Sequence, residues 1–205
     1  MKYYSALNVF KFSWDQVTST YWSRYPNPFS KHVLSEDVVE REVKDGCLWS
    51  RRLITKTNKL PKWGARFVPG SKSACIVEES VVDPVKKTLT TYTRNINLTR
   101  IMVVVEKCVY RPCKDDRHAT ECTKEAWVDS SIYGFSRAIQ AFGLDRFRKN
   151  ATRATKGLEY ILLKTYEPES LPEHMSLLGN INKELKEKAQ KQAARTLGKG
   201  AVIAN

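Results

Sequence analysis

At residues 22–34 the chain reads WSRYPNPFSKHVL, and here a helical pattern gives way to strand patterns. Proline fixes φ and disfavours helix in the residue before it, so Pro26 and Pro28 favour extended backbone on either side of Asn27. A helix that reaches this point must end near Arg24. We therefore expect a rigid corner between a first helix and the strands that follow, rich in charged and aromatic side chains.

The residues before this corner predict one strand and one helix. Residues 2–12 contain four aromatic residues among strand-forming neighbours, which is typical of a β-strand. Residues 13–16, Ser-Trp-Asp-Gln, match a capping box, in which Ser and Gln satisfy each other's backbone donors. Trp14, Val17 and Tyr21 follow at positions i, i+3 and i+7, so one side of this helix should be buried.

The residues after the corner alternate with a period of two. Residues 33–43 and 47–56 flank Asp45-Gly46, a strong signal for a two-residue hairpin turn. Four more strand patterns occupy residues 74–83, 87–97, 99–110 and 120–131. Their connections are short enough for hairpins, so we expect an antiparallel meander of about seven strands rather than a parallel sheet.

A long helical pattern runs from about Phe135 to Tyr166, long enough to lie across the whole sheet, which predicts an α+β fold. Four basic residues share one of its faces: Arg146, Lys149, Arg153 and Lys156. This face is either a binding surface or simply solvated. After Glu167 the composition changes to a short linker and a segment rich in Lys, Ala, Glu and Gln. We expect a folded domain at residues 1–167 and a helical or disordered tail at 168–205.

The total charge favours an anionic partner. The chain has 205 residues, with 35 Lys and Arg against 22 Asp and Glu, which gives a net charge of +13. Such a charge attracts nucleic acid, an acidic membrane surface or an anionic small molecule. No run approaches the ~20 apolar residues of a membrane span, and the first residues lack a secretory cleavage site. We therefore expect a soluble protein without a secretory signal.

The cysteines and histidines do not predict a metal centre. Five cysteines are an odd number, and none has CxxC spacing, which argues against a zinc ribbon or a redox pair. The three histidines are scattered along the chain. We expect reduced thiols and no metal, although Cys108, Cys113 and Cys122 could approach one another across a hairpin.

Function is less constrained by these patterns than fold. No GxSxG, P-loop, GxGxxG or HExxH motif is present, so we do not expect an enzyme. Nucleic-acid binding stays open because the long helix is basic, and so does a scaffold role, but no RNA- or DNA-recognition motif accompanies the charge. An antiparallel sheet closed by one long helix can instead hold a cavity. A cavity with an apolar interior and cations at its mouth suits an amphipathic anion such as a phospholipid.

Residues 59–72, KLPKWGARFVPGSK, interrupt the strand patterns. Two prolines and two glycines exclude a regular strand, whereas Trp63 and Phe67 supply apolar side chains. A loop of this length is either functional or an Ω-loop that packs over the core.

Four separated segments together resemble the PRELI family of mitochondrial phospholipid-transfer proteins. They are residues 24–43 (RYPNPFSKHVLSEDVVEREV), 50–63 (SRRLITKTNKLPKW), 81–97 (VVDPVKKTLTTYTRNIN) and 142–162 (FGLDRFRKNATRATKGLEYIL). The resemblance runs in the same order over about residues 1–166. It implies a concave antiparallel sheet with helices over it, no catalytic activity, and no cofactor other than a bound phospholipid as cargo.

The resemblance also implies a ligand, a location and a partner. Family members move phosphatidic acid from the outer to the inner mitochondrial membrane, which feeds cardiolipin synthesis, and others transfer phosphatidylserine. We therefore expect phosphatidic acid as ligand, the intermembrane space as location, and transient contact with anionic mitochondrial membranes. The family works with a small helical-hairpin protein stabilised by twin cysteine pairs. A heterodimer with such a partner, and no nucleic acid, is the corresponding expectation.

The family's head-group and membrane-contact residues can be placed on this sequence by motif. They match Arg24, His32, Arg52, Lys56, Lys59, Arg146, Asn150 and Arg153. We expect Arg24 at the mouth of the cavity. The family has lysine where this chain has Arg146 and Arg153, a change that keeps the charge and favours forked contacts with phosphate.

The family's lid loop corresponds to residues 59–72. Its matching residues are Lys59, Leu60, Pro61, Trp63, Phe67 and Gly70. Trp63 and Phe67 would contact a membrane when the loop opens.

Overall fold

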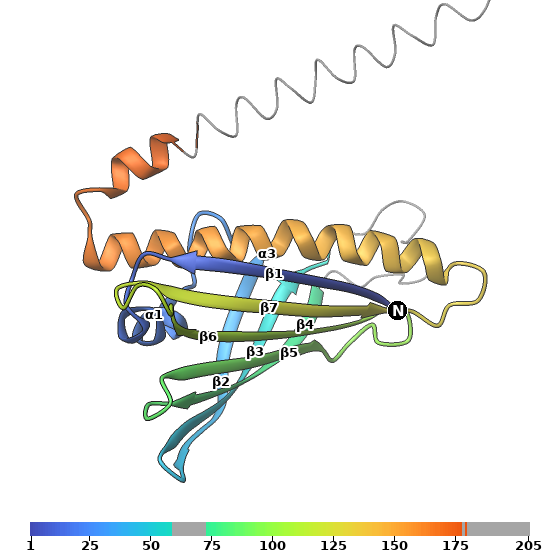
Figure 1. The fold of residues 1–205 in the computed structure, drawn as a ribbon. Helices are drawn as coiled ribbons and strands as arrows, with labels where there is room; N and C mark the ends of the chain where they lie inside the picture. Colours follow the sequence, from blue (N-terminus) through green and yellow to red (C-terminus); the bar gives the residue numbers. More distant parts are fainter. Residues whose placement is uncertain (59–72, 178, 180–205) are drawn as a thin grey trace, which may run out of the picture. The chain divides into compact units, whose positions relative to one another are not determined.

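A computed structural model describes residues 1–58, 73–177 and 179 of the chain. It divides into two compact units, residues 1–162 and 163–205. Figure 1 shows the helices and strands of residues 1–166 in chain order. They are β1 (Lys2–Phe10), α1 (Trp14–Thr20), η1 (Tyr21–Ser23), β2 (Val33–Lys44), β3 (Cys47–Thr57), β4 (Ser73–Asp83), β5 (Thr88–Asn95), β6 (Val103–Pro112), β7 (Thr120–Asp129) and α3 (Ser136–Tyr166).

The seven strands form one antiparallel sheet in the order β1-β7-β6-β5-β4-β3-β2. Strands β2 to β7 are a meander, which confirms the predicted α+β fold with its antiparallel sheet. Asp45 and Gly46 both have positive φ, 52° and 74°, as the predicted two-residue turn requires. Strand β1 pairs with β7, with Lys2 opposite Val128. That pairing places the first strand of the sequence beside the last one, and no local sequence pattern predicted it.

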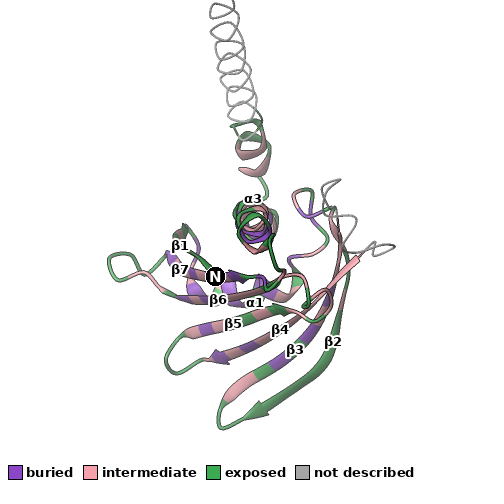
Figure 2. Ribbon diagram, turned by 90° about the vertical axis from the view of Figure 1, so that its right-hand side faces the viewer, coloured by how far each residue is buried: buried purple, intermediate pink, exposed green. Residues whose placement is uncertain are grey.

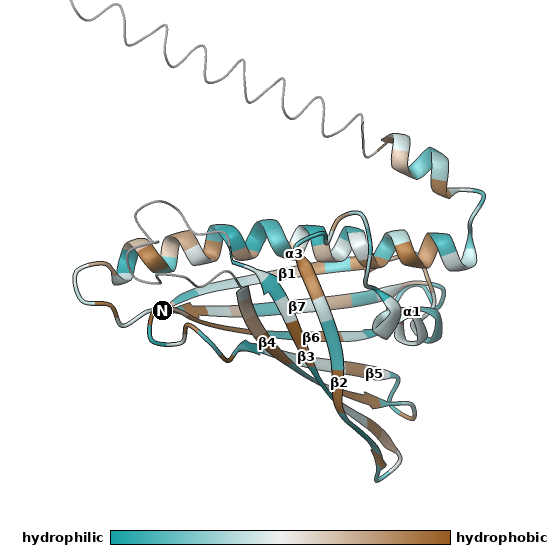
Figure 3. Cartoon of the chain, turned by 180° about the vertical axis from the view of Figure 1, so that it is seen from behind, coloured by the Kyte–Doolittle hydropathy of each residue, from teal (hydrophilic) through white to brown (hydrophobic). Residues whose placement is uncertain are grey.

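Helix α3 covers one face of the curved sheet (Figures 1 and 2). Along β7 the alternate residues Thr120, Cys122, Lys124, Ala126 and Val128 are buried on this face. Figure 3 shows hydrophilic residues along the middle of α3. The face of the sheet under α3 therefore contains the core of the unit.

Helix α1 forms as its capping pattern predicts. The backbone N–H of Ser13 donates to the Gln16 side chain, and the backbone N–H of Gln16 donates to Ser13 Oγ. Trp14, Val17 and Tyr21 are all buried, which confirms the predicted stripe.

The corner after η1 packs against α3. The Nδ2 of Asn27 donates to the carbonyl of Arg24 at 2.6 Å, and its Oδ1 accepts from the backbone N–H of Phe29 at 2.9 Å. A Cβ at Gly157 of α3 would lie only 2.6 Å from the Asn27 side chain, so glycine is needed for this close approach. Phe29 also packs edge-on against Tyr160 of α3. The corner thus fixes the position of the long helix.

In the second unit the structure describes residues 163–177 and 179, which include the end of α3 and a further helical segment that begins at residue 171. The backbone N–H of His174 donates to the carbonyl of Ser170 at 3.1 Å, at the start of this segment. Part of the expected linker is therefore helical. Most of the expected tail, residues 180–205, lies outside the described residues.

Candidate functional site

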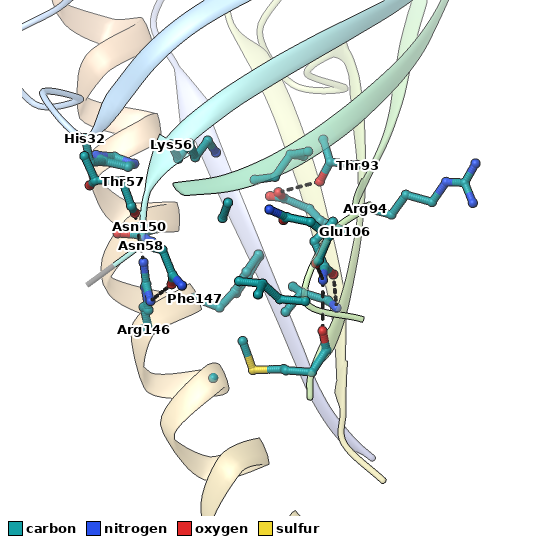
Figure 4. Close-up of a pocket in the computed structure, with 18 of the residues that line it drawn as sticks. His32, Lys56, Thr57, Asn58, Thr93, Arg94, Glu106, Arg146, Phe147 and Asn150 are labelled. Atoms are coloured by element: carbon teal, nitrogen blue, oxygen red, sulfur yellow. Dashed lines mark hydrogen bonds between the residues drawn. The ribbon is translucent and has the colours of Figure 1, made fainter. Parts of the chain in front are cut away.

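A cavity of about 190 Å³ lies between α3 and the inner face of the sheet (Figure 4). Most of its wall is apolar, formed by Ile76, Leu98, Ile101, Met102, Val104, Phe147, Ala151 and Ala154. The apolar residues come from β4, the β5–β6 loop, β6 and α3. Such a wall suits a hydrocarbon chain, because the transfer of apolar surface from water into apolar surroundings is favourable.

One side of this cavity is polar and basic. Lys56 at the end of β3 lines it and forms no ion pair with any residue that the structure describes. Arg146 of α3 donates to Asn58 Oδ1 and to the carbonyl of Thr57, both at 3.2 Å. The Nδ2 of Asn58 is buried and has no hydrogen-bond partner among the described residues. An unpartnered donor beside two cations favours an anionic oxygen as ligand.

His32 lies on the same side and is half-buried. Burial lowers the pKa of its imidazole to about 4, and the positive charges of Lys56, Arg153 and Arg146 add to this effect. His32 is therefore neutral near pH 7, and one of its ring nitrogens can accept a hydrogen bond.

A second, smaller cavity of about 70 Å³ adjoins the first. The two share Tyr25, Lys56, Ile76, Thr93, Glu106 and Ala154 as lining residues. The smaller cavity is more polar, because Arg24, Glu78 and Lys124 also line it. The Nζ of Lys124 lies 3.3 Å from Glu106. Burial lowers the pKa of Lys124, but Glu106, Cys108 and Cys122 together raise it by more than burial lowers it, so the ammonium stays protonated.

A buried ion cluster lies beside the smaller cavity. Glu78 of β4 is 2% exposed and lies 2.5 Å from both Arg24 and Arg52. Arg52 also contacts Glu36 at 2.9 Å, and the Tyr21 hydroxyl donates to Glu78 at 2.9 Å. Burial raises the pKa of Glu78, but the two guanidinium groups outweigh burial and lower it to about 2. The cluster thus holds two cations in the interior, with the ionised carboxylate of Glu78 shared by both and Glu36 as a second partner of Arg52.

The structure brings four of the predicted site residues together in the wall of the larger cavity: His32, Lys56, Arg146 and Asn150. Arg153 is exposed on α3, near enough to His32 to affect its pKa. Lys59 and the expected lid residues Leu60, Pro61, Trp63, Phe67 and Gly70 lie outside the described residues.

Two predicted residues have different surroundings from those expected. Arg24 is 7% exposed and lines the smaller cavity, so its expected position at a cavity mouth is wrong. Arg52 is 1% exposed and lines neither cavity. Neither side chain can contact a membrane in this conformation. The reason is Glu78, which supplies the charge and hydrogen bonds that make both guanidinium groups stable in the interior.

Sequence reasoning missed Asn58, Glu78 and Lys124. Glu78 and Glu79 are neighbours in a strand, so one of them must face inward, and this signal could have suggested a buried cation as partner. The sequence contained no signal for Asn58. Its side chain is oriented by Arg146, which donates to Oδ1 and leaves Nδ2 without a partner among the described residues, and Arg146 is far away in the sequence. The described part of the chain contains no group of His, Cys, Asp and Glu that could hold a metal ion. Within it, no helix is both long and apolar enough to cross a membrane.

Comparison with known proteins decides the family. The model of the PRELI-like family matches residues 15–169. The chain belongs to the PRELI-like family. It is 51% identical to PRELI domain-containing protein 1, mitochondrial, of Bos taurus over 193 residues, an alignment that covers 93% of this chain and 86% of that protein. The human protein of the same name is 53% identical over 167 residues, or 80% of this chain and 76% of that one.

One more distant relative and two solved structures of similar fold extend the comparison. Protein ups1 homolog of Schizosaccharomyces pombe is 35% identical over 158 residues, covering 76% of this chain and 92% of that protein. A crystal structure of a Thermus thermophilus protein matches with a TM-score of 0.56 at 15% identity, over 81% of this chain and all of that one. That of Ara h 8.0201 matches with a TM-score of 0.52 at 9% identity, over 80% of this chain and 98% of that one. These structures share the fold of the PRELI-like chain.

Proposed function

We propose that this chain is a non-catalytic lipid-transfer protein that carries phosphatidic acid between the outer and inner mitochondrial membranes. The supporting observation is that Lys56, Arg146 and the unpartnered Nδ2 of Asn58 meet in a cavity whose remaining wall is mostly apolar. A phosphate monoester offers acceptor oxygens and negative charge to these three donors. The apolar wall would contact acyl chains.

The size of the cavity adds a condition to this proposal. A volume of about 190 Å³ is smaller than the roughly 300–1,000 Å³ of pockets that enclose drug-sized ligands. A two-chain phospholipid therefore requires a wider cavity than the one described. Loading must be accompanied by a conformational change that separates parts of the wall.

Native mass spectrometry of the purified chain tests whether it carries a phospholipid. A transfer assay between donor and acceptor vesicles then compares the wild type with Lys56→Glu, which should move phosphatidic acid about tenfold more slowly, a difference of about 1.4 kcal/mol. Lys44→Glu, an exposed position in the β2–β3 hairpin, is the matched control. Equal rates for wild type and Lys56→Glu, with no lipid bound, would overturn the proposal. If the wild type transfers phosphatidylserine faster than phosphatidic acid, phosphatidylserine replaces phosphatidic acid as the proposed cargo.

Location and partner are parts of the same proposal. The relatives named above as mitochondrial support a mitochondrial location, and we assign the chain to the intermembrane space. Protease protection in fractionated mitochondria tests this assignment. A small helical-hairpin protein with twin cysteine pairs is the proposed partner, and co-expression followed by size-exclusion chromatography should give a heterodimer. Separate elution of the two proteins would contradict the proposed heterodimer.

A further inference from the structure

The end of the sheet that borders the larger cavity brings distant parts of the chain together. In the antiparallel register Lys2 lies opposite Val128, and Val103 lies opposite Asp129. The N-terminus, residues 96–102 and residues 130–135 therefore leave the sheet at the same end, as Figures 1 and 3 both show. We call the exposed side chains of these three segments and of the adjoining Arg94 and Arg137 the loop end.

Residues 96–102 form a well-anchored loop with two sides. The side chain of Asn97 accepts from the backbone N–H of Cys75 at 2.8 Å and donates to the carbonyl of Ser73 at 3.2 Å. On one side, Leu98, Ile101 and Met102 line the cavity. On the other, Ile96 is 48% exposed, and Arg100 is also exposed. The same short loop thus forms a cavity wall and part of the outer surface.

Residues 130–135 present an aromatic side chain to solvent from an ordered turn. The Oγ of Ser136 donates to the carbonyl of Ser130 at 2.6 Å, and Gly134 has a positive φ of 74° that closes the turn. Tyr133, next to this glycine, is 100% exposed. A tyrosine in this position has an apolar ring and a polar hydroxyl, the combination that favours the boundary between membrane and water.

The loop end is also positively charged. Lys2, Arg94, Arg100 and Arg137 are exposed there, and Figure 4 shows the Arg94 side chain pointing away from the cavity. Among the described residues 1–3, 93–103 and 128–137, Asp129 is the single acidic residue, and the N-terminal amino group lies 3.1 Å from it. The opposite end of the sheet mixes charges, because α1 and the turns there carry aspartates at positions 15, 45, 83, 115 and 116 among lysines. Of the two ends of the sheet, as far as the structure describes them, the end that borders the cavity is therefore the one that combines exposed apolar side chains with cations and a single carboxylate.

We propose that the loop end is the surface with which this chain docks on an anionic lipid bilayer. Tyr133 and Ile96 enter the interfacial region, and the flanking cations are attracted to the negative surface potential. Docking in this way sets the loop that forms the cavity wall against the membrane. The inference rests on the proposed function, since a lipid carrier must exchange its cargo at a bilayer.

Flotation of the full chain with phosphatidylcholine vesicles, with or without phosphatidylglycerol, tests this surface. Phosphatidylglycerol supplies negative charge without being the proposed cargo. We expect binding to the anionic vesicles, and about tenfold weaker binding for both Tyr133→Asp and Arg100→Glu. Val85→Asp at the opposite end is the matched control, since Val85 is 90% exposed, and it should bind like the wild type.

Two further measurements separate docking from cargo binding. Uptake of detergent-dispersed phosphatidic acid, followed by native mass spectrometry, needs no bilayer, so Tyr133→Asp should load as well as the wild type. If the wild type fails to load, the proposed function is wrong whatever the flotation result. If both loop-end variants float like the wild type, or Val85→Asp loses as much binding as they do, the docking surface is wrong. Thermal unfolding verifies that each variant is folded.

Discussion

Glu78 is the residue on which the buried charges of the sheet depend. Its carboxylate contacts Arg24 and Arg52, and all three side chains are removed from solvent. Replacement by glutamine removes the negative charge that the two buried guanidinium groups share, and Arg52 keeps only its contact with Glu36. We expect Glu78→Gln to lower the free energy of unfolding by about 3–5 kcal/mol, measured by urea denaturation.

The neighbouring residue provides the control for this prediction. Glu79 contacts Arg51 at 3.0 Å on the outer face, where both side chains are more than 40% exposed. Exposed ion pairs contribute at most about 1 kcal/mol, so Glu79→Gln should have little effect. Similar losses for the two variants would contradict the role of the buried cluster.

The acid dependence of stability follows from the same carboxylate. The pKa of Glu78 is about 2 in the folded chain, against an ordinary value of 4.5. The unfolded chain therefore binds this proton at a higher pH than the folded chain does. The stabilisation is present in full above the unfolded pKa and is lost as pH falls through the folded pKa, by about 3 kcal/mol in total.

Urea denaturation at several pH values between about 6 and 2 measures this loss. As pH falls, the free energy of unfolding should decrease more steeply for the wild type than for Glu78→Gln, because glutamine does not titrate. Parallel curves for the two proteins would show that Glu78 does not titrate as described.

His32 reports on the charge of the larger cavity. Burial and the cations Lys56, Arg153 and Arg146 lower its pKa to about 4. A bound phosphate adds negative charge beside the ring, so the pKa of His32 should rise when phosphatidic acid is loaded. NMR titration of the ring protons with and without the lipid measures the shift, with the exposed His118 as internal control. If the pKa of His32 does not change on loading, the phosphate does not bind beside His32.

At the scale of elements, the contact between the corner and α3 depends on Gly157. A Cβ there would lie 2.6 Å from Nδ2 and 2.8 Å from Oδ1 of Asn27, whose amide already bonds to the backbone on both sides. Asn27 cannot move without breaking these bonds. We expect Gly157→Ala to destabilise the first unit by about 1–3 kcal/mol in denaturant titrations, despite the higher helix propensity of alanine.

Gly179 is the matched control for this substitution. It is also helical, and a Cβ would meet no atom of the described residues within 4 Å. Gly179→Ala should therefore leave stability unchanged or raise it slightly. A neutral Gly157→Ala would show that the corner does not hold the helix at this distance.

At the scale of the whole molecule, we expect the two adjoining cavities to form one binding volume when cargo is loaded. Ala154 of α3 lines both of them. Its replacement by phenylalanine fills space that cargo would occupy, and the added ring lies in a cavity rather than in the packed core. We expect Ala154→Phe to reduce the lipid found by native mass spectrometry at least about tenfold, with a melting temperature close to that of wild type. Unchanged lipid content would show that cargo does not use this region.

The features that the sequence determined by itself are those set by neighbouring residues. The capping box at Ser13 and Gln16, the turn at Asp45-Gly46 and the strand alternation depend on backbone geometry within a few residues, so each was predictable. The extent of α3 follows in the same way from its helical pattern. Family membership likewise follows from separated motifs in a fixed order.

The tertiary structure alone decided which charges are buried and where the site lies. Alternation assigns Arg52 and Glu78 to faces of their strands, but only the β3–β4 register puts them opposite each other, and only the corner adds Arg24 to the same carboxylate. The pairing of β1 with β7 and the unpartnered Nδ2 of Asn58 also depend on residues far apart in the chain. Ion-pair energies and burial depend on distances across the fold, and a local pattern does not contain those distances.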